Sequence, residues 1–415
     1  MHAILVTMGT DGDVIPFVGV GEKLLARGYR VTLVTNEPFQ RYADAAGFDF
    51  RPLISAAEHH RLFGDPDFWH PLKGPLIGAR LGAELIGRQY ELLADLARSD
   101  CVLVANPGVV AARIIHDALK RPLATLLLQP GMIASTNAPP IMPGGLSLPR
   151  DMPKWMGRGY WRLLDALGDQ LLGQDINRLR ASLGLSPMRR IFQWWLSPQR
   201  VIGLFPDWYG PPQDDWPPQV RLAGFPMVDG ERDRLSADVL AFCDAGPPPI
   251  AFTLGTGMMH AATFFRAAVA ACRSLGARGL LLTKHRNQLP DALPSTVRHY
   301  DFVPFLQLLP HCSAIVHHGG IGTVAKAMAT ATPQLILPLG WDQPDNAARV
   351  KRLGTGDWLP RGERDGRGLA RALKRIVTPT VAERCRAVAG RFQDGDSLDI
   401  AAGWIEELAA DAVIR

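Results

Sequence analysis

The chain has 415 residues, enough for two domains, and 47% of them are hydrophobic, which is ordinary for a globular protein. Its 45 basic and 40 acidic side chains leave a formal charge of only +5, so the composition does not favour a nucleic-acid partner. Five cysteines without a C-x-x-C pair favour reduced thiols over a disulfide framework or a zinc site. We expect a cytoplasmic protein, because a predicted strand begins at His2 without a signal-peptide pattern and no apolar run is long enough to span a membrane.

The first half of the chain alternates between predicted strands and helices. Residues 3–6 and 30–34 have the pattern of strands, and residues 16–27 and 39–46 that of helices ended by glycine. This order predicts an α/β fold with a doubly wound parallel sheet. Further strands are predicted at 101–105, 123–128 and 201–204, with less regular pieces at 55–78 and 131–153 and helices within 155–181.

Prolines mark a change of domain. They concentrate in 206–218 and again at 247–249. A second series of predicted elements follows: a strand at 250–254, a helix at 261–275 and a strand at 279–282. We therefore predict domains at 1–217 and 218–390 and a terminal segment at 391–415 that contains an amphipathic helix.

One stretch of the second domain has the pattern of an anion site. A strand at 313–316 is followed by the turn His317, His318, Gly319, Gly320, and Gly322 and Thr323 then open a helix that runs to 330. A glycine turn leaves the first helical N–H groups unpaired, and these groups and the helix dipole suit a diphosphate, to which an imidazole can also donate.

The loop after the next strand carries polar side chains suited to a sugar. Pro338 ends the strand at 334–337, so Trp341, Asp342 and Gln343 fall at the edge of the sheet where ligands bind in open α/β folds. A carboxylate beside an amide suits a pair of sugar hydroxyls. Asn346 follows, as a sugar contact or, by our preference, a helix cap.

This string resembles the donor-binding signature of the nucleotide-sugar glycosyltransferases with the GT-B fold. The resemblance implies two Rossmann-like domains that face each other across a cleft, the first binding the acceptor and the second the nucleotide-sugar. It also implies that the terminal helix returns to the first domain. Phe302 and Val303 lie where the family holds the nucleobase, by an aromatic ring and a backbone amide. Gly255 and Thr256, after the first strand of the second domain, are further candidates for contact with phosphate.

The loop after the first strand supplies a candidate catalytic base. Transfer of a sugar to an alcohol needs a base for the hydroxyl proton, and Asp11 and Asp13 lie at this loop-to-helix junction. We favour Asp13, which stands where the branch of the family with sterol and antibiotic glycosyltransferases also has aspartate; helix capping is the structural alternative. The expected reaction is a single displacement with inversion that needs no metal and no cofactor, because the helix after Gly320 stabilises the departing diphosphate.

Several middle stretches are similar to those of bacterial rhamnolipid rhamnosyltransferases, the subgroup that we take as closest. They include Gly64-Asp65-Pro66, Ser197-Pro198-Gln199 and Asp215-Trp216-Pro217. This similarity implies a dTDP-rhamnose donor and a hydroxylated lipid acceptor, with UDP-glucose or another UDP-sugar left open.

The irregular pieces of the first domain carry apolar residues suited to such an acceptor. The candidates are Phe63, Trp69, Met132 and Trp155. Residues 154–162 mix aromatic and basic side chains, a pattern that suits either peripheral contact with the inner face of a membrane or a helix with snorkelling arginines.

Three alternatives stay open from the sequence. One is a UDP-sugar transferase acting on a small aromatic or polyketide product, another is a sugar-nucleotide epimerase or phosphorylase of the same fold, and the third is a non-catalytic nucleotide-sugar-binding partner. The sequence lacks G-x-x-x-x-G-K-[ST], G-x-S-x-G and H-E-x-x-H, which argues against an ATPase, a serine hydrolase and a zincin. The sequence does not determine the donor sugar, the acceptor length, the oligomeric state or the residue that holds the ribose.

Overall fold

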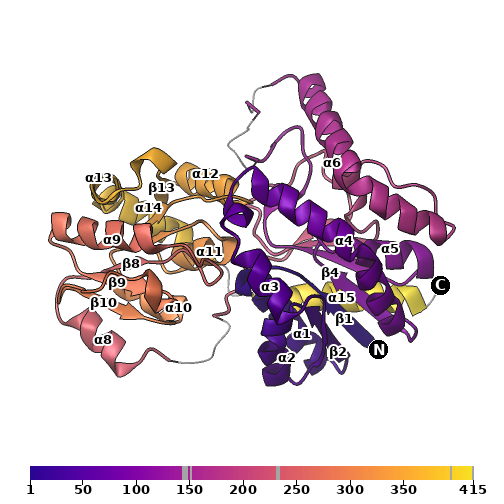
Figure 1. Cartoon of the computed structure of the whole chain (residues 1–415), viewed down its shortest axis with the longest axis horizontal. Coiled ribbons are helices and arrows are strands. Elements are labelled where there is room, and N and C mark those ends of the chain that lie inside the picture. The colour runs from indigo at the N-terminus through magenta and orange to yellow at the C-terminus, as the bar shows by residue number, and fades with distance from the viewer. Residues whose placement is uncertain (143–147, 150–151, 230–233, 393–394, 414–415) are drawn as a thin grey trace.

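The first domain is built on a parallel sheet. The computed structural model describes residues 1–142, 148–149, 152–229, 234–392 and 395–413 (Figure 1). In these residues the first sheet has the order β3-β2-β1-β4-β5-β6-β7. Its strands are β1 (His2–Val6), β2 (Arg30–Thr35), β3 (Asp49–Pro52), β4 (Cys101–Ala105), β5 (Leu123–Leu127), β6 (Arg200–Gly203) and β7 (Val220–Leu222).

The second domain repeats this plan with the order β10-β9-β8-β11-β12-β13, again all parallel. Its strands are β8 (Ile250–Phe252), β9 (Gly279–Leu282), β10 (Val297–Tyr300), β11 (Ala314–His317), β12 (Gln334–Ile336) and β13 (Gly356–Trp358). The predicted α/β class with two doubly wound domains is confirmed.

Helices cover both sheets. Those before β8 are α1 (Asp11–Ala26), α2 (Gln40–Ala46), α3 (Ala56–Phe63), α4 (Lys73–Leu96), α5 (Val110–Leu119), α6 (Lys154–Ser182), α7 (Ile191–Trp194) and α8 (Ala237–Asp244). Those after it are α9 (Ala262–Leu275), α10 (Phe305–Leu308), α11 (Ile321–Ala329), α12 (Gln343–Leu353), α13 (Gly366–Ile376), α14 (Pro379–Ala389) and α15 (Ser397–Val413). Short 3₁₀ turns include η2 (Pro66–Trp69).

The strand order brings the predicted site residues to the carboxyl edges of both sheets. In each sheet the direction of winding reverses at a central pair of strands, β1 beside β4 and β8 beside β11. Ligands of open α/β sheets bind beyond the carboxyl ends of the strands at this reversal. The loop after β1 carries the candidate base, and the loops after β8 and β11 carry the candidate diphosphate residues. The topology alone therefore places these residues at the carboxyl edges of the sheets, where ligands bind.

Two sequence predictions about boundaries are wrong. The first long helix begins at Asp11 rather than at residue 16, because Thr10 and Asp13 form a capping box and Pro16 is accommodated within the helix. The first domain also extends past residue 217, because β7 pairs with β6 and completes the first sheet.

The terminal helix α15 packs on the first domain. Its buried side chains, which include Leu398, Ala401 and Ile405, join the same apolar cluster as Phe17 and Val20 of α1. A Cβ added at Gly19 of α1 would lie 2.6 Å from Leu398 Cδ1, so the two helices pack at close range.

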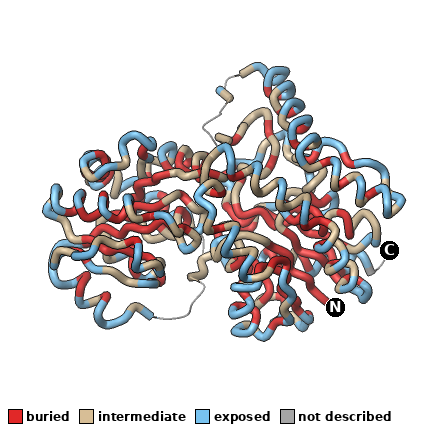
Figure 2. Tube along the Cα trace, viewed as in Figure 1, coloured by how far each residue is buried: buried red, intermediate tan, exposed pale blue. Residues whose placement is uncertain are grey.

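The burial pattern follows the strands, which form the buried centre of both domains (Figure 2). A further apolar cluster joins the domains, since Phe205, Tyr209 and Phe225 pack with Val324 and Met328 of α11. Among the helices of the described residues, none combines the length and the apolar character that crossing a membrane requires.

Candidate functional site

The Asp13 carboxylate lies directly over the backbone of Gly9. Gly9 has a φ of +154°, and a Cβ added there would lie 2.2 Å from Asp13 Oδ2, so only glycine leaves room for this carboxylate. Thr10 donates to the same oxygen from its backbone N–H at 2.8 Å and from its hydroxyl at 3.2 Å. The loop therefore fixes one carboxylate oxygen, and no described residue forms a hydrogen bond with the other. Burial raises the pKa of Asp13, more than the hydrogen bonds from Thr10 lower it.

The surroundings of Asp11 shift its pKa in the opposite direction from that of Asp13. Its Oδ1 accepts from the Tyr42 hydroxyl at 2.6 Å and from the Arg41 guanidinium at 2.8 Å. Burial pushes its pKa up, but hydrogen bonds from Tyr42 and Thr256 and the charges of Arg41 and Lys284 outweigh burial and hold the pKa below its ordinary value. Asp11 is thus a tie between the domains and a poor base, whereas Asp13 is the better placed of the two.

In the second domain, α11 begins with an uncapped turn. Gly320 is its N-cap residue and has no side chain to satisfy the first helical N–H groups. A Cβ added at Gly322, in the first turn, would have no atom within 4 Å, so the space before the helix is open. Thr323 is partly exposed beside it. The predicted anion site therefore has free backbone donors and room for a ligand.

His318 lies between two glycine turns. A Cβ added at Gly255 would be 2.7 Å from its ring, and one added at Gly320 would be 2.6 Å from it. Its Nδ1 is buried without a hydrogen-bond partner. Burial lowers the pKa of His318 to about 4, so the ring is neutral at pH 7. A neutral imidazole with an unpaired nitrogen can still bind a polar ligand atom at this turn.

His317 does not belong to the ligand surface, and its prediction as a diphosphate contact is wrong. Its ring is fully buried, Nδ1 accepts from the Gly319 N–H at 3.2 Å, and Nε2 lies 3.1 Å from Gln334 Oε1. Burial lowers its pKa to about 3. Both ring nitrogens are used to hold the turn, so His317 supports the shape of the site from beneath.

The loop before α12 carries Trp341, Asp342 and Gln343 in different orientations. Trp341 has a φ of +55°, uncommon for a bulky residue, and its indole donates to the Phe68 carbonyl of the first domain at 3.2 Å. Gln343 is buried, and its Oε1 accepts from the N–H groups of Leu339 and Gly340, so it fixes the loop. Asp342 Oδ2 accepts from the Asn346 amide at 2.7 Å, and the Asp342 carboxylate interacts electrostatically with Asp13 of the first domain.

Asn346 is the site residue whose role the sequence did not show. It is fully buried, and its amide donates to the Gly319 carbonyl at 2.9 Å and to Asp342 Oδ2 at 2.7 Å. Tyr209 donates to its Oδ1 at 2.9 Å, which fixes the orientation of the amide. Asn346 therefore neither caps a helix nor faces the sugar; it joins the diphosphate turn to the sugar loop. Only its spacing from Asp342 on a helix, i to i+4, hinted at this contact.

Asp13 and Asp342 approach each other from the two domains. Burial, and then the charge of Asp13, raise the pKa of Asp342 to about 7. A Cβ added at Gly257 would lie 2.9 Å from Thr10 Cγ2, so the loop after β8 also touches the loop after β1. The candidate base, the sugar loop and the glycine turns thus meet at one place between the domains.

The predicted nucleobase residues lie at the edge of the second sheet. Phe302 and Val303 line a hollow of about 400 Å³ together with His299 and Tyr300. Phe302 is partly exposed, and Lys284 Nζ lies 5.7 Å from its ring centroid. Val303 is buried.

The four predicted acceptor residues have different surroundings. Phe63 is buried in an aromatic cluster with Phe68 and Trp69. Trp69 donates to the Phe63 carbonyl at 2.9 Å and packs towards Gly257 of the second domain. Met132 packs against the apolar cluster that joins the domains, and Trp155 is exposed at the start of α6. The prediction of a shared pocket wall is wrong for Phe63, because its ring is core.

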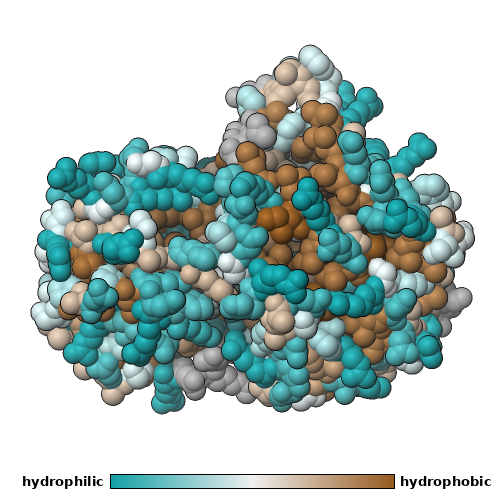
Figure 3. All heavy atoms as spheres, in the orientation of Figure 1, coloured by the Kyte–Doolittle hydropathy of each residue, from teal (hydrophilic) through white to brown (hydrophobic). Residues whose placement is uncertain are grey.

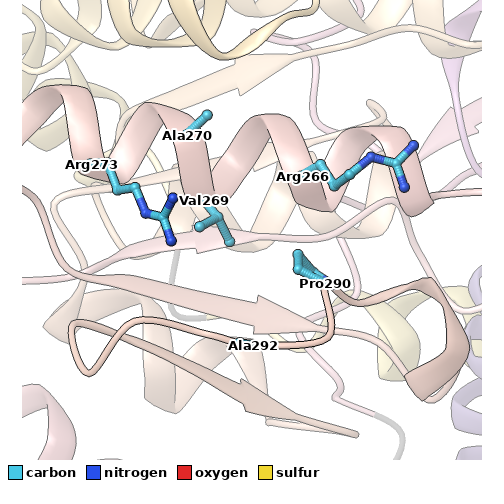
Figure 4. Close-up of a pocket in the computed structure, with 6 residues that line it drawn as sticks. All are labelled: Arg266, Val269, Ala270, Arg273, Pro290 and Ala292. Atoms are coloured by element: carbon cyan, nitrogen blue, oxygen red, sulfur yellow. The ribbon is translucent and has the colours of Figure 1, made fainter.

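A separate hollow of about 300 Å³ lies between α9 and the segment 290–292 (Figure 4). Its polar side chains are Arg266 and Arg273, and none of the candidate site residues lines it. Among the described residues no group of three or more His, Cys, Asp and Glu side chains is arranged to hold a metal ion.

Two Rossmann-like domains, with the candidate base in the first and an uncapped helix start in the second, have the arrangement of the GT-B fold. Comparison with protein families agrees with this class. Residues 3–135 match the glycosyltransferase family 28 N-terminal domain, and residues 279–396 match the C-terminal domain of the erythromycin biosynthesis protein CIII-like family. The first domain is therefore similar to a glycosyltransferase family 28 domain, and the second to a domain of the EryCIII-like family.

Relatives span the whole chain. The O-mycaminosyltylonolide 6-deoxyallosyltransferase of Streptomyces fradiae is 29% identical over 99% of this chain and 98% of its own length. The sterol 3-beta-glucosyltransferase of Arabidopsis thaliana is 26% identical over 96% of this chain and 64% of its own length.

Solved structures share the fold. The kitacinnamycin glycosyltransferase has a TM-score of 0.73 at 19% identity, over 98% of this chain and 99% of its own. The spinosyn rhamnosyltransferase SpnG, complexed with thymidine diphosphate, has a TM-score of 0.69 at 18% identity, over 98% of this chain and all of its own.

Proposed function

We propose that this protein transfers a hexose, rhamnose or glucose, from a dTDP- or UDP-sugar to a hydroxyl group of an apolar acceptor, with inversion at the anomeric carbon. The observation that carries the proposal is the contact between the domains around Asp13. Gly257 of the second domain lies against Thr10, and Ile321 at the start of α11 packs against the core of the first domain. The charge of Asp13 also acts on Asp342. Asp13 can accept a proton, Asp342 can hold the sugar, and the start of α11 can hold the diphosphate.

In the proposed step the acceptor oxygen attacks the anomeric carbon while Asp13 removes its proton. The bond between that carbon and the diphosphate oxygen breaks, and the electron pair leaves with the nucleoside diphosphate. The first N–H groups of α11 and the positive end of its dipole stabilise this charge, so the step needs no metal ion. The raised pKa of Asp13 suits a base that acts near neutral pH.

The acceptor is proposed to be a hydroxylated lipid, such as a hydroxy-fatty acid. The similarity to rhamnolipid rhamnosyltransferases supports this class, as does a relative named a sterol glucosyltransferase. A macrolide or another polyketide is the second candidate, because the relative from Streptomyces fradiae is named an O-mycaminosyltylonolide 6-deoxyallosyltransferase.

The test is release of nucleoside diphosphate with EDTA present. The protein is mixed with dTDP-rhamnose or UDP-glucose and with a 3-hydroxy-fatty-acid dimer or a macrolide aglycone. We expect acceptor-dependent release that Asp13→Asn lowers by about 10²–10⁴-fold, whereas calorimetry still shows binding of dTDP or UDP.

Asp11→Asn is the matched control, since it also removes one carboxylate from the same turn. It should weaken the tie between the domains and leave the larger part of the turnover. Equal turnover in the wild type and Asp13→Asn would overturn the role of Asp13, and nucleotide binding without transfer to any acceptor would favour a non-catalytic binding partner.

A further inference from the structure

Helix α6 presents a row of large apolar side chains to solvent. The row consists of Met156, Leu163, Leu167 and Leu171, and Trp155 lies beside its first member. Spacings of seven, four and four residues keep these side chains on one side of a helix. Trp155 is 67% exposed and Leu163 is 59% exposed, so this is not the packed face of α6.

The apolar surface continues onto α4. Leu72, immediately before α4, and Leu76 are also exposed, and α4 packs along α6. Figure 3 shows apolar residues gathered over α4 and along α6 towards its projecting end. We call these exposed residues of α4 and α6 the apolar ridge. Exposed apolar side chains gathered on one face, unlike ones scattered singly over a surface, mark a contact surface.

The apolar ridge ends beside the candidate sugar loop. A Cβ added at Gly78 of α4 would lie 3.0 Å from Trp341 Cη2, and one added at Gly74 would be 3.5 Å from the same ring. A molecule held on the ridge near Leu76 is therefore next to the loop that carries Asp342.

Positive charge accompanies the apolar ridge. Lys154, Arg158 and Arg162 of α6 and Arg80 of α4 have no acidic partner among the described residues, and Glu84 is an exposed acid one turn beyond Arg80.

The acids in the middle of α6 are used internally. Asp165 is buried and accepts from the Phe192 N–H and the Arg190 guanidinium. Asp169 accepts from the N–H groups of Arg190 and Ile191 at 2.8 and 2.9 Å. The solvent side of the helix therefore offers apolar and cationic groups together.

We propose that the apolar ridge docks the protein on an anionic lipid bilayer. Apolar side chains on one helix face with flanking lysine and arginine are the features that hold a helix in the interface of an anionic membrane. A second copy of the chain fits less well, because a two-fold contact along α6 would bring these unpaired cations together without acids to meet them. The docking does not depend on which sugar is transferred, and with a lipid acceptor it would deliver the substrate beside Trp341.

Vesicle sedimentation tests this surface without any activity assay. The full chain is mixed with vesicles of phosphatidylcholine alone or with 30% phosphatidylglycerol (about one lipid in three). We expect binding to the anionic vesicles that weakens with salt. Replacing Lys154, Arg158 and Arg162 together by Gln should weaken it about a hundredfold, taking about 1 kcal/mol for each cation. Replacing Leu163, Leu167 and Leu171 by Ser should also abolish most of it.

The matched control removes the same charge from the second domain. Arg367, Arg371 and Lys374 are exposed on α13, and their replacement by Gln should leave vesicle binding unchanged. Circular dichroism of each variant checks that it is folded. Three results would overturn the proposal: no binding of the wild type to anionic vesicles, equal loss in the α13 variant, or a dimer of the wild type that the leucine variant abolishes.

Discussion

Asp11 and Asp13 are two positions apart, yet their surroundings push their pKa values in opposite directions. Asp11 is held low by hydrogen bonds and by the cations Arg41 and Lys284, despite burial. Asp13 is raised because burial outweighs its contacts with Thr10. Two carboxylates whose environments separate their pKa values commonly take different roles, and here one is a structural tie and the other a candidate base.

Gly9 should be indispensable because of the carboxylate above it. Gly9→Ala places a methyl group where Asp13 Oδ2 lies, and we expect turnover to fall about as far as in Asp13→Asn, by 10²-fold or more. Gly28→Ala is the control, since Gly28 also has a positive φ but a Cβ there meets no atom within 4 Å. Both variants should lose stability through backbone strain, measured by thermal melting, but only Gly9→Ala should lose turnover. Equal losses of turnover would contradict the steric argument.

Asp342 should make the stability of the fold depend on pH. Its pKa is about 7 in the folded chain and 3.8 ordinarily, so the folded state binds a proton that the unfolded state has released between these values. Stability from this group is therefore highest at acid pH and falls as the pH rises to 7. Asp342→Asn removes the penalty and should raise Tm at pH 8 by roughly 2–4 °C per kcal/mol regained, with no gain near pH 4.

Asp345→Asn is the comparison for that measurement. Asp345 forms a buried ion pair with Arg349 at 2.7 Å and accepts from the Ile141 N–H. Removing its charge should lower Tm, because a buried guanidinium loses its partner. A lower Tm in Asp342→Asn at pH 8 would show that the Asp342 carboxylate stabilises the fold.

Among the elements, the central strands are predictable from sequence and the edge strands are not. The sequence indicated β1, β2, β4, β5 and β6 and β8, β9, β11 and β12, which are runs of buried apolar residues. It did not indicate β3, β7, β10 and β13, which are the four outer strands of the two sheets. An outer strand is partly exposed and short, so its residues carry neither a continuous apolar run nor a long alternation.

The candidate site divides in the same way. The glycine turns and the Asp342-Gln343 loop are local patterns, and chain order alone placed them at the edges of the sheets. Local sequence does not determine the direction of a side chain. His317 faces the core because its ring contacts Gln334 of the neighbouring strand. Local sequence also does not show a contact between distant residues, such as the hydrogen bond from Tyr209 to Asn346. Sequence pattern therefore finds the loops of a site more readily than the residues that hold them.

Tyr209 should affect donor binding although it contacts no ligand. Tyr209→Phe leaves Asn346 Oδ1 buried without a donor, at a cost of about 1–3 kcal/mol, and frees the amide that joins Gly319 to Asp342. We expect a donor KM raised by roughly 3–10-fold with a smaller change in kcat, if about 1 kcal/mol of the cost appears in binding.

Ser197→Ala is the matched variant for Tyr209→Phe. Ser197 is also fully buried, and its hydroxyl donates to the Leu123 carbonyl within the first domain. It should lose stability without a change in donor KM, measured by the same release assay. A donor KM that moves equally in both variants would mean that lost stability, rather than the amide, is responsible.

At the scale of the whole molecule, chain order and domain membership differ. The segment that follows the second sheet packs on the first one, since α15 lies against α1 and contributes Leu398, Ala401 and Ile405 to the first core. Proline content suggested a boundary near residue 217, but β7 pairs with β6 and extends the first domain beyond it. The packing of α15 on the first domain agrees with the return of the terminal helix that the family resemblance implied.

This arrangement predicts that α15 contributes strongly to the stability of the first domain. Leu398 is buried over Gly19 of α1, whereas Ile400, two residues later, is 40% exposed. Leu398→Ala should cost about 2–5 kcal/mol, because it removes buried methyl groups and leaves a cavity. Ile400→Ala should stay within about 0.5 kcal/mol of the wild type. Denaturant unfolding measures both, with hydrogen exchange of β1 and β4 reporting on the first domain. Equal and small losses of unfolding free energy in the two variants would mean that α15 contacts the first domain without stabilising it.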